Sequence, residues 1–174
     1  MGTAERTYTG GHADLLKALG SQRNFLRRTV RDLTDEQAAQ RTTASELCLG
    51  GIIKHVAFTE RQWANFIEVG PPAMTYGTGE ASAASWLDGF RMLPGETLAG
   101  LLEKYDEVAR HTDDLLTGGV DLEATQPLPA APWHEPGATW TVRHVILHIL
   151  AEIAQHSGHA DIIRESLDGA KTMG

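Results

Sequence analysis

Residues 144–161 carry the densest group of chemically capable side chains in the chain, and they read HVILHILAEIAQHSGHAD. Four of the eight histidines fall here, together with Glu152. Imidazole and carboxylate groups are common ligands for zinc and other first-row transition metals. The same side chains could instead form a proton relay or the solvent-facing side of a helix. Their positions around a helix bear on which interpretation is right.

Helical geometry separates these histidines. An α-helix has 3.6 residues per turn and rises about 1.5 Å per residue. His156 therefore points toward the apolar face and Glu152 lies at its edge, whereas His148 and then His144 turn progressively outward. Along the axis His148 and His156 are about 12 Å apart, too far to share an ion through bonds of about 2 Å. Glu152 with His156 is the best-oriented ligand pair, and His148 with Glu152 is the second choice.

A third ligand must come from another helix. His55 lies in the sequence LGGIIKHVAFTERQW, at the edge of the apolar face of its own predicted helix. Helix bundles build metal sites from side chains on facing helices, although a lone histidine in such a place is more often a hydrogen-bonded structural residue than a ligand. Trp63 and Phe66 could line a pocket, but core packing is the favoured interpretation. His134, in a loop, could cover the site.

The elements that position these residues are predicted to be helices. Four segments have helical periodicity, roughly 11–33, 45–69, 95–117 and 139–167. We predict Ser45 as the N-cap of the second, and Thr139 or Thr141 as the N-cap of the fourth. A short turn opens at 34–36, a short helix is possible at 82–92, and no convincing strand is found. Asp161 and Arg164 are spaced for an ion pair. The pattern predicts one all-α domain over 1–174, a four-helix bundle with long inter-helix loops.

Composition narrows the possible partners. The chain has 174 residues, a net charge of −8 and a pI near 5.4, so we expect neither nucleic acid nor a membrane surface as partner. We find no signal peptide and no apolar run long enough to span a bilayer. A single cysteine, Cys48, fits a cytoplasmic location. It lies about 10 Å along the helix from His55, so we expect a buried core residue rather than a ligand.

The segments at 49–63 and 148–165 resemble DinB-like, DUF664-type proteins, and the resemblance covers nearly the whole chain. It implies a DinB/YfiT-like four-helix bundle with a divalent metal in its core. The mycothiol-dependent branch, which includes mycothiol S-transferases and maleylpyruvate isomerase, uses His, Glu and His as ligands. These fall on His55, Glu152 and His156. His148 and His159 flank the three and could orient them or carry protons, although solvated or capping roles suit both equally well.

The resemblance implies a metal-dependent thiol S-transferase. A low-molecular-weight thiol, in this branch mycothiol, would be held by the metal as thiolate and would attack an electrophile. We expect no additional C-terminal domain, which favours the S-transferase over the isomerase. The ligand set favours Zn²⁺, with Ni²⁺, Mn²⁺ or Fe²⁺ as alternatives. Two other functions stay open: a metal hydrolase that activates water, and a non-enzymatic metal-binding bundle. A residual apolar strip on the long helices suggests a homodimer.

Overall fold

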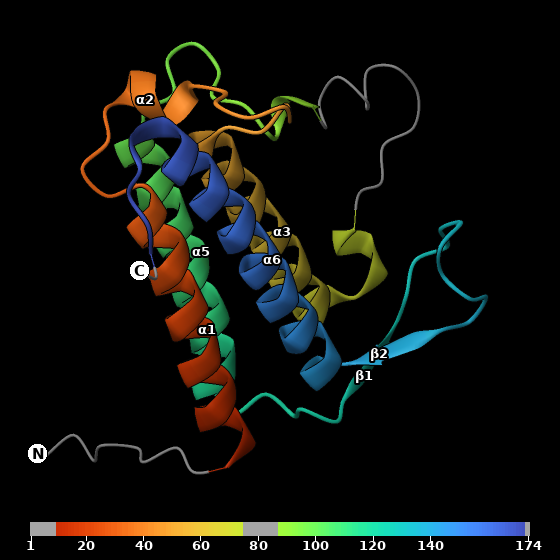
Figure 1. Cartoon of the computed structure of the whole chain (residues 1–174). Helices are drawn as coiled ribbons and strands as arrows, with labels where there is room; N and C mark the ends of the chain where they lie inside the picture. Colours follow the sequence, from red (N-terminus) through yellow and green to blue (C-terminus); the bar gives the residue numbers. More distant parts are fainter. Residues whose placement is uncertain (1–9, 75–86, 173–174) are drawn as a thin grey trace, which may run out of the picture.

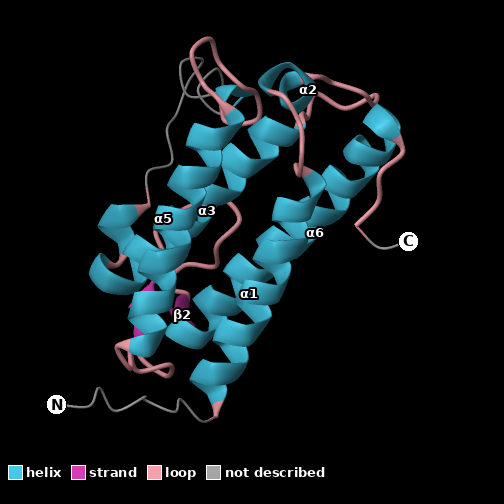
Figure 2. Ribbon diagram, turned by 90° about the vertical axis from the view of Figure 1, so that its left-hand side faces the viewer, coloured by secondary structure: helices cyan, strands magenta, loops and turns pink. Residues whose placement is uncertain are grey.

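Four long helices form the body of the molecule in the computed structural model, which describes residues 10–74 and 87–172 (Figure 1). They are α1 (Gly11–Thr29), α3 (Leu49–Val69), α5 (Leu98–Thr117) and α6 (Val142–Asp168). The main packing contacts join α3 to both α5 and α6, and α6 to α1. In a side view, α1 and α6 run together, as do α3 and α5 (Figure 2). The predicted all-α bundle is confirmed.

One apolar core runs through the bundle because each long helix buries a stripe of aliphatic and aromatic side chains. Burying one such side chain contributes roughly 1.5–3 kcal/mol, so the stripes supply most of the energy that holds the helices together. The fully buried members include Leu19, Leu26, Ile52, Ile53, Phe66, Tyr105, Leu116, Ile146, Ile149 and Ile153. Phe66 is therefore a core residue, as predicted.

The start of α6 is set by Thr141, one of the two predicted caps. Its hydroxyl accepts a hydrogen bond from the backbone N–H of His144 at 3.1 Å. The predicted start at residue 139 is wrong, and so is the expectation of no strands. Residues Thr139–Thr141 form β2, which pairs antiparallel with β1 (Thr125–Pro127). Strands of three residues are too short to display a two-residue periodicity in the sequence.

The start of α3 also differs from the prediction. Cys48, not Ser45, is the N-cap, and its sulfur accepts a hydrogen bond from the N–H of Gly51 at 3.4 Å. The Ser45 hydroxyl instead contacts the hydroxyl of Thr43 at 2.9 Å within the preceding loop. Cys48 is only 1% exposed, so the prediction that it is a buried residue is confirmed.

Arg164 joins α6 to the C-terminal end of α1. The predicted pair with Asp161 is wrong, because the Arg164 guanidinium binds Asp168 and also donates to the backbone carbonyls of Thr29 and Arg31. These carbonyls lie at the C-terminal end of α1 and just beyond it, where a cation is favoured. This end is at Thr29, earlier than the predicted 33. One charged side chain thus ties α6 to α1.

Short elements complete the chain between the long helices. The turn predicted at 34–36 is the start of α2 (Asp35–Ala39), whose capping box uses Thr34 and Gln37. After α3 comes the 3-10 helix η1 (Pro71–Ala73). Most of the short helix predicted at 82–92 lies outside the described residues, although Leu87 and Asp88 are helical. In the described part of the chain, no helix is both long and apolar enough to cross a bilayer.

Candidate metal centre

Three of the predicted site residues meet between α3 and α6. His55 comes from α3, and Glu152 and His156 lie one turn apart on α6. One nitrogen or carboxylate oxygen from each lies within 4.8 Å of the others. The two imidazole rings are 4.7 Å apart between centroids, and Oε2 of Glu152 is 3.7 Å from Nε2 of His156. The three side chains therefore present their ligand atoms to one common space, and we refer to them as the triad.

Both histidines of the triad favour the neutral form. Burial, followed by the nearby His156, lowers the pKa of His55 from its usual value to about 4. Burial also lowers the pKa of His156, although the carboxylate of Glu152 opposes this shift. A neutral imidazole keeps a lone pair for a metal ion. At neutral pH the triad therefore has two neutral nitrogen ligands ready.

Glu152 supplies the only formal charge of the triad. Its ion-pair partners among the described residues are two histidines, His148 at 3.8 Å and His156 at 3.7 Å, and no lysine or arginine. Its side chain is only 28% exposed. A partly buried carboxylate beside two imidazole lone pairs is a set of acceptors that lacks a cation of its own, and a divalent metal ion would supply one. The residues present fit such an ion.

Aromatic rings hold the triad from two sides. The ring of Phe90 stacks on His55, with centroids 4.0 Å apart and planes 25° apart. On the other side, His148 meets Trp63 edge-on at 4.8 Å and reaches Glu152. Trp63 is 6% exposed, so it both packs in the core and supports His148. The His148 side chain is 30% exposed and contacts Trp63, so it faces outward less than helical angles suggest.

His159 contacts the remaining nitrogen of His156. The two Nδ1 atoms are 3.5 Å apart, whereas Nε2 of His156 faces Glu152. One of the two Nδ1 atoms must carry a proton for this contact to be a hydrogen bond. Such a partner fixes the tautomer and the orientation of a ligand histidine. His159 is thus in contact with His156, and its role in orienting that ring stays a prediction.

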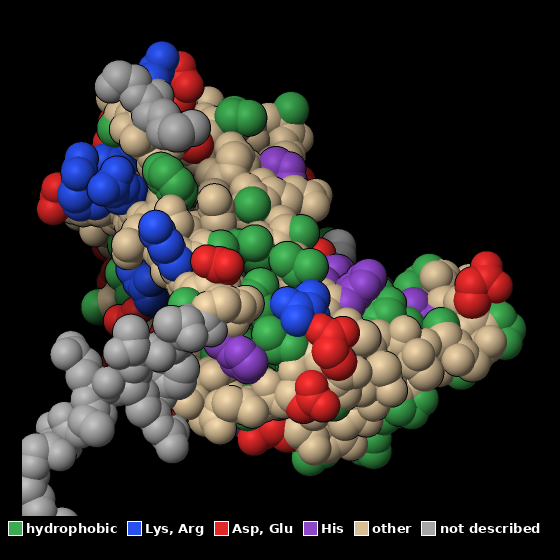
Figure 3. Space-filling model, turned by 90° about the horizontal axis from the view of Figure 1, so that it is seen from below, with side chains coloured by type: hydrophobic (Ala, Val, Ile, Leu, Met, Phe, Trp, Pro, Cys, Tyr) green, Lys and Arg blue, Asp and Glu red, His purple; other side chains and the backbone are tan. Residues whose placement is uncertain are grey.

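Two other histidines lie farther away, next to Trp140. His144 is exposed and stacks on Trp140 at 4.3 Å, as its outward angle predicts. His134 lies 6.2 Å from Trp140 and its Nδ1 is 3.0 Å from the carbonyl of Pro129. It thus neighbours the aromatic residues rather than the triad. From below, histidine side chains are visible where the arm that carries β1 and β2 leaves the bundle (Figure 3).

Sequence reasoning missed two residues of this region, Phe90 and Trp140. Trp140 stacks on Trp63 at 4.9 Å and is 5.1 Å from His148. Phe90 lies outside the four periodic segments, and Trp140 lies at the edge of the fourth, in β2. Helical periodicity assigns neither ring to a helix face, so only long-range packing places them. Their aromatic character was the only available hint.

Comparisons with known proteins agree with the fold. A family model described as mycothiol-S-transferase matches residues 14–169. Among solved structures, the chain is similar to a conserved protein from Enterococcus faecalis with a TM-score of 0.65. The two are 12% identical, and the similarity covers 94% of this chain and 100% of the other, which shows a shared fold alone. No curated protein matches the chain.

Proposed function

The chain belongs to the mycothiol-S-transferase family, and from this premise we propose that it is a metal-dependent S-transferase whose thiol substrate is mycothiol. The observation that carries the metal dependence is the triad. Two neutral imidazoles and one carboxylate bring their ligand atoms within 4.8 Å of one another. The carboxylate has no lysine or arginine partner in the described part of the chain.

His55, Glu152 and His156 would hold the ion. Zn²⁺ suits two imidazoles and a carboxylate, and three protein ligands are the number found in catalytic zinc sites. When bound, such an ion lowers the pKa of a thiol that coordinates it and so makes the nucleophilic form available near neutral pH. The only cysteine of the chain, Cys48, is buried and caps α3. The reacting sulfur is therefore that of the substrate.

Residues around the triad orient it. His159 contacts Nδ1 of His156 and leaves Nε2 directed toward Glu152. Phe90 covers one face of the His55 ring. These contacts limit rotation of both rings, so the ligand atoms stay turned toward one another. A preset ligand geometry reduces the cost of ordering when ion and substrate bind.

The reaction balances without an oxidant or a reductant. The thiol loses its proton to water, its sulfur forms a bond to an electrophilic carbon, and the leaving group departs with the electron pair of the broken bond. With chlorodinitrobenzene as a model electrophile, the leaving group is chloride. The products are a thioether and chloride.

Turnover with a panel of thiols tests the proposal. Purified protein loaded with Zn²⁺ is incubated with chlorodinitrobenzene and mycothiol, glutathione or no thiol. We expect thioether formation with mycothiol, little with glutathione, and none in His156→Ala. His111→Ala is the matched control, because His111 is exposed on α5 and forms a surface ion pair with Glu68, which contributes little.

The other outcomes separate the alternatives. Full activity in His156→Ala would exclude the metal mechanism. Hydrolysis of ester or amide substrates without thiol would instead select a metal hydrolase. Protein without bound metal, whose melting temperature ignores chelator, would indicate a non-enzymatic bundle. Loading with Ni²⁺, Mn²⁺ or Fe²⁺ in the same assay tests the choice of Zn²⁺.

We further propose that the protein is a homodimer. The support is that α6 exposes two large aliphatic residues, Leu147 at 47% and Ile162 at 61%. Sedimentation equilibrium tests this: a mass of one chain at micromolar concentration would refute it.

A further inference from the structure

His55 is the histidine of the triad that lacks a polar neighbour outside it. Among the described residues, neither of its ring nitrogens has a hydrogen-bond partner, whereas Nδ1 of His156 lies 3.5 Å from Nδ1 of His159. Metal-ligating histidines usually donate their second nitrogen to a carboxylate, a carbonyl oxygen or water, which fixes the orientation of the ring. The His55 ring instead has Phe90 stacked on it at 4.0 Å, with planes 25° apart. Phe90 is thus the ring contact from outside the triad that fixes the plane of His55.

Gly51 lies one helical turn before His55, on the same side of α3. Four residues along a helix bring the chain back to nearly the same side, about 6 Å farther along the axis. The backbone of Phe90 lies against Gly51, while its ring reaches His55. One loop residue therefore contacts α3 twice, at Gly51 through its backbone and at His55 through its side chain.

The approach at Gly51 leaves no room for a side chain. A carbon added there would lie 1.9 Å from the carbonyl oxygen of Phe90, 2.2 Å from its carbonyl carbon and 2.7 Å from the nitrogen of Arg91. All three are backbone atoms, so rotation of a side chain cannot relieve the overlap, and the segment itself would have to move. Glycine is also among the least favourable residues in a helix. The close packing of the Phe90 segment, rather than helix formation, therefore accounts for Gly51.

Gly50, the preceding residue, contacts a different kind of atom. A carbon added there would lie 2.2 Å from the sulfur of Met92 and 2.6 Å from its Cγ. Both atoms belong to a flexible, unbranched side chain, which can take another rotamer without moving the backbone. Met92 is only partly buried, so its side chain has room to move. Of the two neighbouring glycines, Gly51 alone constrains the backbone that carries Phe90.

Polar contacts hold the same segment to the start of α3. The Cys48 thiol donates to the Phe90 carbonyl at 3.7 Å. Lys54 Nζ donates to the Arg91 carbonyl at 3.2 Å and to both carboxylate oxygens of Glu96 at 2.9 Å. The backbone at Phe90 and Arg91 is thus tied to the cap and the second turn of the helix that carries His55.

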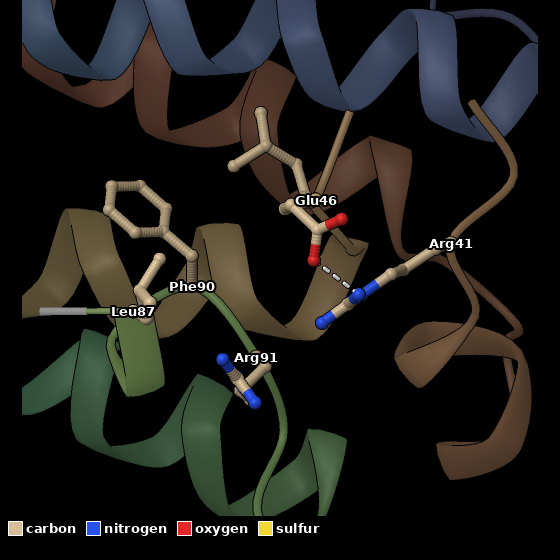
Figure 4. A pocket seen from close by; sticks show the side chains of 6 residues that line it. Arg41, Glu46, Leu87, Phe90 and Arg91 are labelled. Atoms are coloured by element: carbon tan, nitrogen blue, oxygen red, sulfur yellow. Dashed lines mark hydrogen bonds and ion pairs between the residues drawn. The ribbon is translucent and has the colours of Figure 1, made fainter. Parts of the chain in front are cut away.

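These backbone anchors matter because packing does not enclose the Phe90 side chain on every side. Together with Leu47 and Leu87, Phe90 lines a cavity of about 130 Å³ (Figure 4). Atoms that line a cavity lack packing partners on that side. Side-chain packing alone would therefore let the Phe90 ring move into the cavity and away from His55. The place of the ring depends on where its backbone is held.

We propose that Gly51 is a positioning residue for the metal ligand His55 and that it acts through Phe90. Gly51 admits the Phe90 backbone against α3, and the Phe90 ring then stacks on His55. The stacked imidazole stays turned toward the other two ligands of the triad. The ligand role of His55 rests on the proposed function, whereas the effect of Gly51 on the His55 ring does not.

NMR of the metal-free protein tests the arrangement of the rings. An aromatic ring stacked on an imidazole displaces the resonances of the imidazole protons upfield. We expect the His55 ring protons to lose this displacement in Phe90→Leu and in Gly51→Ala, and to keep it in Phe90→Tyr and in the matched control Gly50→Ala. Phe90→Leu leaves α3 unchanged, so it tests the stacking contact even where Gly51→Ala does not fold. A displacement retained in Gly51→Ala or in Phe90→Leu would overturn the proposal.

Zn²⁺ affinity, measured by competition with a chromophoric chelator, tests the consequence for the metal. Loss of a residue that orients a ligand lowers metal affinity by about 10–100-fold. We expect this loss in Gly51→Ala and Phe90→Leu, and none in Gly50→Ala or Phe90→Tyr. Because the first two substitutions act at one contact, the double variant should lose no more affinity than Phe90→Leu alone. An equal loss in Gly50→Ala, or additive losses in the double variant, would contradict a specific role for Gly51.

The same measurements separate this proposal from the proposed function. If the unsubstituted protein binds no Zn²⁺, the metal centre is refuted and with it the ligand role of His55. The ring resonances of the metal-free protein then still decide whether Gly51 sets the place of the His55 ring. Conversely, Zn²⁺ binding that is equally tight in Gly51→Ala and Phe90→Leu would refute the positioning role and leave the metal centre standing.

Discussion

Two polar clusters interrupt the apolar core. One gives its carboxylate an arginine partner, and the other does not. In the first, between α1, α3 and α5, Glu60 is 1% exposed and pairs with Arg23, which is 3% exposed. Arg23 also donates to Asp113 at 2.7 Å. In the second cluster, the triad, the described residues give Glu152 only histidine partners. The more deeply buried carboxylate is thus the one that has its own cation.

This difference separates a structural cluster from a candidate metal centre. Burial alone would lower the pKa of Arg23, but Glu60 and Asp113 raise it. The buried pair of Arg23 and Glu60 is therefore neutralised within itself. Three buried polar atoms of the cluster have no hydrogen-bond partner among the described protein atoms: Nε of Arg23, Oε2 of Glu60 and the Tyr105 hydroxyl. Ordered water is the usual partner of such atoms. A cavity of about 280 Å³ borders Arg23. The triad instead has acceptors that need a cation. Whether a carboxylate has a cationic partner, more than how deeply it is buried, therefore distinguishes the candidate metal centre from the structural cluster.

The largest expected effect is on stability, from Glu60→Ala. Removal of one partner of a buried ion pair costs about 3–5 kcal/mol, because a buried charge is left uncompensated. The melting temperature should fall by roughly 6–20 °C, with metal affinity unchanged. Calorimetry with and without metal measures both. The double variant Glu60→Leu with Arg23→Met should recover most of the lost stability. A loss of stability below about 1 kcal/mol in Glu60→Ala would contradict the assignment of this cluster as structural.

Glu152→Ala is the matched substitution in the triad, and its expected effects are reversed. Metal affinity should fall by more than about 100-fold, because even residues that merely orient ligands are worth 10–100-fold. Stability of the metal-free protein should change by less than about 1 kcal/mol, since no buried cation loses its partner. Competition with a chromophoric chelator gives the affinity, and urea unfolding in chelator gives the stability. Unchanged affinity would remove Glu152 from the site.

Removal of the metal should have a smaller, graded effect. An ion at about 100 times its Kd stabilises the folded state by about 2.7 kcal/mol, so excess chelator should lower the melting temperature by roughly 5–10 °C. The shift should persist in Glu60→Ala and vanish in His156→Ala. A shift of equal size in His156→Ala would mean that the ion binds elsewhere. Differential scanning fluorimetry is sufficient for this measurement.

The last expected effect is on the pH dependence of the metal-free protein. The pKa of His55 is lowered to about 4 in the folded state, whereas an unfolded histidine titrates near 6.5. Between these values the unfolded chain binds more protons, so stability should fall as the pH falls from about 6.5 to about 4. Urea midpoints at several pH values measure the slope. His55→Gln should flatten it and His111→Ala should not; an unchanged slope in His55→Gln would contradict the assignment.

The fold and the residues of the triad could be predicted largely from local patterns in the sequence. Apolar residues recur at helical spacing because each long helix buries one face, so the four helices were predictable while their ends were less so. The three-residue strands and the helix cap at Cys48 leave too little periodic pattern in the sequence to be predicted from it. The i, i+4 spacing of Glu152 and His156 follows from helix geometry alone. The family assignment followed from the same segments, and the match over residues 14–169 confirms it.

Long-range packing decided what surrounds those residues. The sequence by itself determined that His156 faces inward, that Glu152 lies one turn away and that His148 cannot share an ion with His156, because these relations lie within one helix. Only the tertiary structure brought His55 within reach and gave Glu60 its arginine while leaving Glu152 without one. It also placed Phe90 over His55, through glycines that admit its backbone. Those contacts join different elements, and their distances depend on how the helices and loops pack.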